Sequence, residues 1–200
     1  MVALAAALAG CGTSPPPKFY ALSSASAPDG APPADVAVLV GPVSIPADVD
    51  RPQFVVQKGP NSVEVDEYSR WSAPLNDSIA RVVAADLSVL LGSPDVATAS
   101  LANFKAQYRV TIDVQRFDSI RGQGTTLEAV WVVRKANGET RSGRTVAHET
   151  VSGDGFDTLA AAHSRALAKM SADIAGAIRA EAAATADASP APAASKTAGA

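Results

Sequence analysis

The chain has 200 residues, of which 47% are hydrophobic and 18% are charged, and it carries a formal net charge of -3. This length allows one ordinary domain or two small ones. The slightly acidic balance argues against a nucleic-acid partner. Cys11 is the only cysteine, which excludes an intramolecular disulfide framework and a metal site built from several cysteines.

The N-terminal stretch MVALAAALAGC has the features of a processing signal. Its apolar run, Val2 to Ala9, is too short to cross a bilayer, which takes about 20 residues, but suits the h-region of a signal peptide. Leu-Ala-Gly-Cys resembles the lipobox of bacterial lipoproteins, in which cleavage precedes a cysteine that becomes lipidated. We therefore expect residues 1–10 to be a signal peptide and Cys11 to carry lipid. No Lys or Arg precedes the run, so we expect the true start codon upstream; the alternative is a buried helix with a free thiol.

Residues 11–34 have the composition of a leash and linker. Two stretches, Gly12 to Pro17 and Ser23 to Ala34, are rich in small residues and proline. Between them Lys18 to Leu22 (KFYAL) is a short extended piece. This region is either a flexible spacer that holds the domain away from the membrane, or it is partly ordered, with the two aromatic residues of KFYAL docked on a sheet.

Three short strands are predicted next. Asp35 to Ile45 is β-branched and alternating, with a kink or edge position at Pro42. Pro52 to Gln57 and Ser62 to Val65 flank a turn at residues 59–61. The apolar period then changes to that of a helix beginning at Leu75.

This first helix has recognisable boundaries. Ser72 is the predicted N-cap and Pro74 falls in the first turn, where a missing N–H costs little. Gly92 and Pro94 are expected to end it.

Residues 107–151 are predicted to form an antiparallel meander. Tyr108 to Val114 and Leu127 to Val133 alternate apolar and polar residues, as half-buried strands do. Gly122-Gln123-Gly124 supplies the first turn, and Asn137-Gly138 is a strong hairpin signal before the returning strand, residues 144–151.

A second helix is predicted from about Asp157 to Ala182, with an alanine-rich sequence and one apolar face. The residues after it, 183–200, lack large apolar side chains and are expected to be a disordered tail. The ordered domain is thus residues 35–182. The economical packing is an α+β two-layer sandwich: an antiparallel sheet with two long helices on one face.

Few residues suggest chemistry. His148 and His163 are the candidates for general-base work near neutral pH, but His163 lies on the apolar helix face, which favours a core role. No HExxH, G-x-S-x-G or phosphate-binding motif is present. We therefore expect no catalysis, no metal and no cofactor.

Two segments place charged and aromatic residues in predicted loops. The first motif segment is Asp50 to Phe54, and the second motif segment is Tyr68 to Leu75. Arg and Trp are enriched at interface hot spots, so Asp50, Arg51, Arg70 and Trp71 are the candidate partner-binding residues. The structural reading packs Trp71 at the helix start and pairs Arg70 or Arg51 with Asp50 or Glu67.

These segments also carry a resemblance. FYAL at 19–22, VGPVSIP and DRPQFV between 40 and 55, and RWSAPL at 70–75 resemble the ABC-type transport auxiliary lipoprotein family, which includes paraquat-inducible protein C type lipoproteins. YRVTIDVQRFDS at 108–119 and LEAVWVV at 127–133 resemble its second half. The similarity begins near residue 18 and runs to about residue 180.

The resemblance implies a non-enzymatic, periplasm-facing lipoprotein of a Gram-negative envelope. Such proteins accompany MCE-type and ABC-type systems that move lipids between membranes. Gly12 follows the lipidated cysteine, which in such proteins favours outer-membrane sorting.

Three hypotheses stay open. In the first, the domain docks an MCE-type bridge at the outer membrane. In the second it carries a lipid between sheet and helices, in a space lined by Leu127, Trp131, Leu167 and Met170. In the third it is a structural envelope protein that self-associates into a homo-oligomer through edge strands such as residues 54–57.

Overall fold

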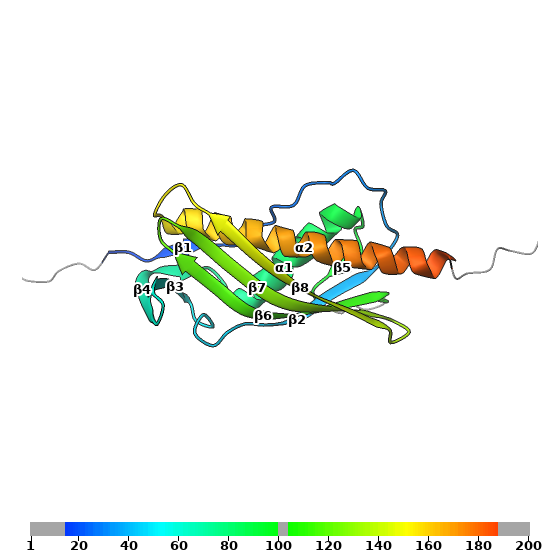
Figure 1. Cartoon of the computed structure of the whole chain (residues 1–200), viewed down its shortest axis with the longest axis horizontal. Helices are drawn as coiled ribbons and strands as arrows, with labels where there is room; N and C mark the ends of the chain where they lie inside the picture. Colours follow the sequence, from blue (N-terminus) through cyan, green and yellow to red (C-terminus); the bar gives the residue numbers. More distant parts are fainter. Residues whose placement is uncertain (1–14, 100–103, 188–200) are drawn as a thin grey trace, which may run out of the picture.

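The computed structural model describes residues 15–99 and 104–187, which form two open sheets and two helices (Figure 1). The predicted signal peptide, Cys11 and the last part of the predicted tail lie outside these residues. In chain order the elements are β1 (Lys18–Tyr20), β2 (Val38–Ser44), β3 (Gln53–Gly59), β4 (Ser62–Trp71), α1 (Leu75–Leu91), β5 (Val96–Ala97), β6 (Tyr108–Ile120), β7 (Gly124–Lys135), β8 (Thr140–Thr150) and α2 (Phe156–Asp187).

The larger sheet has five strands in the order β5-β2-β6-β7-β8. Strands β6, β7 and β8 are antiparallel neighbours, so the predicted meander is confirmed. Gly122 (φ 70°) and Gly138 (φ 94°) occupy its two turns in the left-handed region, which glycine adopts without steric cost. The sequence did not predict that β2 pairs parallel to β6 and β5, an arrangement for which the intervening α1 serves as the crossover.

Both helices cover one face of this sheet and pack against each other (Figure 1). The apolar stripe of α1 and that of α2 are buried, including Ile79, Leu87, Leu167 and Ile174, each with no exposed surface. Burying a side chain of this size contributes about 1.5–3 kcal/mol, so the two stripes supply much of the driving force. The predicted α+β class, with two helices on one face of a sheet, is confirmed.

The start of α1 differs from the prediction. Pro74, not Ser72, is the N-cap residue, and no side chain caps this end. Ser72 instead donates its backbone N–H to the carbonyl oxygen of Tyr20 at 2.8 Å, because the chain before the helix is still extended. The predicted end is confirmed: Gly92 is the left-handed C-cap (φ 62°).

Helix α2 is longer than predicted and ends at Asp187 instead of 182. The alanines after Glu181 have the highest helix propensity, and the hydroxyl of Thr185 donates to the Glu181 carbonyl at 2.8 Å. Residues 183–187 of the expected tail are therefore helical.

The smaller sheet has three strands in the order β1-β4-β3 and lies at one end of the molecule (Figure 1). Strands β3 and β4 form the predicted pair around the turn at residues 59–61, but β4 continues to Trp71, well past the predicted end at Val65. Strand β1 pairs parallel to this continuation.

Residues 21–34, which we call the strap, run along the two helices (Figure 1). The fully buried carboxylate of Asp86 accepts hydrogen bonds from the Ser24 hydroxyl (2.6 Å) and from the next two backbone amides (3.2 and 3.1 Å). Further along, Asp29 pairs with Arg179 at 2.6 Å. Polar side chains of the helices therefore hold a segment whose composition resembles a linker.

Candidate functional site

The two motif segments meet in the smaller sheet. The backbone N–H of Trp71 donates to the carbonyl oxygen of Pro52 at 2.7 Å, and Gln53 lies opposite Arg70. On the other side of β4, the parallel register places Phe19 opposite Arg70. The pairing thus gathers FYAL, DRPQFV and RWSAPL into one small sheet.

The side chain of Trp71 packs on the buried face of this sheet. It is only 7% exposed, and its ring stacks on Phe54 with centroids 4.2 Å apart and an angle of 28° between the planes. Its edge also meets Phe117 and His163, both at 6.2 Å. Of the four candidate partner-binding residues, Trp71 is therefore the one that the structure buries.

Asp50, Arg51 and Arg70 lie closer to solvent. Asp50 and Arg51 are exposed in the turn before β3, where the Asp50 N–H donates to the Pro46 carbonyl at 3.2 Å. Arg70 is half-buried and donates through Nε to the backbone carbonyl of Glu67 at 3.0 Å, not to its carboxylate. These three side chains therefore remain at least partly accessible to solvent.

The outer face of the sheet also carries two aromatic side chains that our prediction of the site omitted. Phe19 is 63% exposed and Tyr68 is 43% exposed. Alternation along β4 puts Tyr68 on the face of Arg70, while Ser69 and Trp71 are buried on the other. Phe19 shares this face because it lies opposite Arg70. Alternation in the sequence could have placed Tyr68, but no local signal pairs Phe19 with it.

His163 lies in the core beneath the site. It has no exposed surface, stacks on Phe117 at 3.7 Å with nearly parallel planes, and its Nε2 lies 2.8 Å from the Ser119 hydroxyl. Burial lowers the pKa of His163 to about 3, which keeps the ring neutral. The other histidine, His148, is exposed and bonds to Thr126 at 3.0 Å. Neither arrangement resembles an activated general base.

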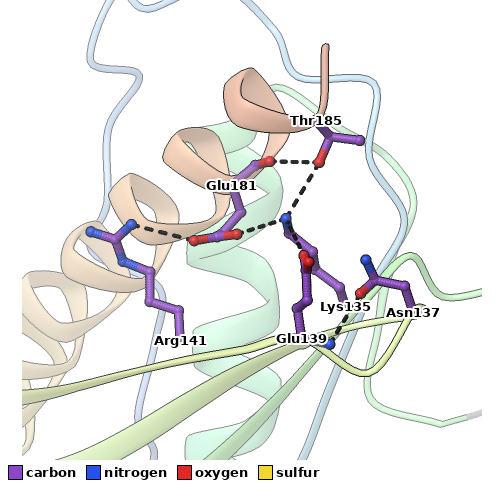
Figure 2. Close-up of polar contacts among 6 residues, drawn as sticks. All are labelled: Lys135, Asn137, Glu139, Arg141, Glu181 and Thr185. Carbon is purple, nitrogen blue, oxygen red and sulfur yellow. Dashed lines mark hydrogen bonds and ion pairs between the residues drawn. The ribbon is translucent and has the colours of Figure 1, made fainter. Parts of the chain in front are cut away.

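A cluster of charged side chains lies near the C-terminal end of α2, and Figure 2 shows its members pointing toward one another. Lys135 Nζ lies 2.7 Å from Glu181 and 2.9 Å from Glu139, and Arg141 lies 3.4 Å from Glu181. Hydrogen bonding to Glu181 and then Glu139 raises the pKa of Lys135, and the same cation lowers the pKa of both carboxyls. These charges satisfy one another, so the cluster fastens the β7–β8 hairpin to α2.

Within residues 15–99 and 104–187, no group of three or more His, Cys, Asp or Glu side chains is arranged to hold a metal ion. In the same part of the chain, no helix is long and apolar enough to span a membrane. The four residues considered for a lipid cavity belong to the hydrophobic core and are 0–6% exposed: Leu127, Trp131, Leu167 and Met170.

Comparison with known proteins agrees with the resemblance. The family model of the ABC-type transport auxiliary lipoprotein component matches residues 20–175. A solved structure of an uncharacterized protein is 19% identical, with a TM-score of 0.67 over 82% of this chain and 99% of that one. Protein XCC0632 from Xanthomonas campestris, assigned to family DUF330, is 20% identical, with a TM-score of 0.65 over the same shares. No curated protein matches the sequence.

Proposed function

The chain belongs to the ABC-type transport auxiliary lipoproteins, and from this premise we propose that it docks an MCE-type lipid-transport bridge at the outer membrane. It would do so as a non-enzymatic component, anchored through Cys11 on the periplasmic face after removal of residues 1–10. The domain from residue 35 to 182 would be the docking module, and the docking residues would be Asp50, Arg51 and Arg70.

One observation carries this proposal. Segments far apart in the sequence, which hold the most distinctive residues of the family resemblance, converge on the smaller sheet. Trp71 and Phe54 stack directly beneath it, which gives the exposed side chains a rigid base. A rigid, preorganised surface loses little entropy on association, as a docking site requires.

The anchor is consistent with this role. Each buried methylene contributes about 0.8 kcal/mol, so one acyl chain holds marginally and two or more hold stably. A lipoprotein cysteine with several acyl chains would keep the smaller sheet near the bilayer, because only seven positions separate Cys11 from Lys18 in β1.

The anchor is tested by labelled palmitate incorporation into the full-length gene product, with Cys11→Ala as control. Membrane separation follows. Cys11-dependent label in the outer membrane supports the proposal, whereas absence of label, or label confined to the inner membrane, contradicts it.

Docking is tested by co-purification with an MCE-domain protein of the same organism. We expect Arg51→Ala and Arg70→Ala to reduce recovery of the complex, because both remove a positive charge from the proposed surface. Arg109→Ala is the matched control, since Arg109 is an exposed arginine on β6 in the larger sheet. Folded variants that bind as well as the control would show that the surface is wrong.

Self-association is a second candidate, favoured by one observation: β3, which contains residues 54–57, is an edge strand of the smaller sheet. Sedimentation velocity over a range of concentrations tests it, and a monomer throughout would refute it.

A further inference from the structure

Phe19 and Tyr68 are two exposed aromatic side chains on the outer face of the smaller sheet. More than two fifths of each side chain is open to solvent, whereas Tyr20, Phe54 and Trp71 below them are half-buried or buried. We call Phe19 and Tyr68 the aromatic patch.

The strand that carries Phe19 is firmly attached to the domain. Tyr20 packs edge-on against Phe54 at 5.9 Å and contacts Phe156 at 5.9 Å. Its carbonyl accepts the Ser72 N–H at 2.8 Å. The strap beyond it is held by Asp86, so it adds no slack to the tether between Cys11 and the domain.

The remaining tether is short. Lys18 follows Cys11 by seven positions, and seven residues span at most about 25 Å even when fully extended. The start of β1, next to Phe19, therefore lies within that distance of a lipidated Cys11.

The opposite end of the molecule is farther from the tether. Helix α2 contacts Tyr20 through Phe156 at one end and Lys135 through Glu181 at the other. At about 1.5 Å per residue, these two points on the helix are roughly 38 Å apart. The smaller sheet, at the end where the described chain begins in Figure 1, is thus the end next to the anchor.

We propose that the aromatic patch rests in the interfacial layer of the bilayer that holds the Cys11 lipids. This rests on the proposed lipidation of Cys11. A phenyl ring enters the boundary between headgroups and acyl chains, and a tyrosine keeps its hydroxyl in water. A second contact beside the tether orients the domain on the bilayer.

The test places a tryptophan at each position of the lipidated, full-length protein. Vesicles of phosphatidylethanolamine and phosphatidylglycerol are made with or without lipids brominated near the glycerol end of the acyl chains. In the variants Phe19→Trp and Tyr68→Trp, we expect the brominated lipids to quench the fluorescence of the introduced tryptophan. Val146→Trp is the matched control, because Val146 is 52% exposed on β8 in the larger sheet. Trp71 and Trp131 are buried, and their emission is subtracted using the unsubstituted protein.

The outcomes separate this inference from the proposed function. Flotation with the vesicles reports the anchor, so a protein that does not float refutes both proposals. A protein that floats, but whose added emission at positions 19 and 68 is quenched no more than the control, refutes the aromatic patch alone. Loss of complex with the MCE-domain protein in Phe19→Ser and Tyr68→Ser, without quenching, assigns the patch to a protein partner and also overturns the inference.

Discussion

Stability should fall between neutral and mildly acidic pH because of one buried imidazole. His163 has a pKa lowered from 6.5 to about 3 by burial. Below pH 6.5 the unfolded chain binds a proton at this position and the folded chain does not, so acid favours unfolding. The stabilisation is complete above pH 6.5 and declines as the pH falls toward 3.

The magnitude follows from linkage. Each pH unit in this window costs about 1.36 kcal/mol, so at about pH 5 the free energy of unfolding should be roughly 2 kcal/mol lower than at about pH 7.5. Glu149 and Glu181 also have a lowered pKa, so they stabilise the folded protein at neutral pH. They contribute to the loss of stability on acidification only below about pH 4.5, their ordinary pKa, and therefore do not account for the change between about pH 7.5 and about pH 5.

Urea unfolding at the two pH values measures this difference. We expect His163→Gln to be destabilised at neutral pH, since it loses the stack on Phe117, but to lose much less stability on acidification. The exposed His148→Gln is the matched control and should retain the full pH effect. If His163→Gln loses as much stability on acidification as the unsubstituted protein, the buried imidazole is not the cause.

Two further substitutions test the packing. Gly143→Ala should lower the free energy of unfolding by about 1–3 kcal/mol in urea titrations, because a Cβ there would overlap the indole ring of Trp131. Gly176→Ala, whose Cβ would meet no neighbouring atom, is the control and should be neutral or stabilising; equal losses would contradict the argument. Asp86→Ala should release the strap, measured as faster hydrogen exchange at the amides of residues 25–26 while core amides stay protected. Unchanged exchange would mean that other contacts hold the strap.

Local patterns were enough for the regular elements. The helical period from Leu75 predicted α1, and alternation with glycine turns predicted β6, β7 and β8. Both patterns are read from neighbouring residues, and helices and hairpins are made from neighbouring residues too. The prediction of Ser72 as N-cap was wrong because the backbone N–H of Ser72 donates to the carbonyl oxygen of Tyr20 in β1, a strand far away in the sequence.

The candidate site was predicted only in part. Composition and resemblance indicated Asp50, Arg51, Arg70 and Trp71, and the burial of Trp71 agrees with the alternative prediction that this residue packs at the helix start. The exposure of Phe19 could not be predicted from the FYAL motif, because it depends on the pairing of β1 with β4.

The amino-acid order sets where the helices and hairpins form and where glycine turns the chain. Folding in three dimensions decides that Phe19 lies opposite Arg70, that DRPQ meets RWSAPL, and that Asp86 holds the strap. The physical reason is the separation along the chain over which each kind of interaction acts. Helix and turn preferences act over a few residues, whereas parallel pairing and buried hydrogen bonds join residues about 50 or more positions apart and depend on how the whole core packs.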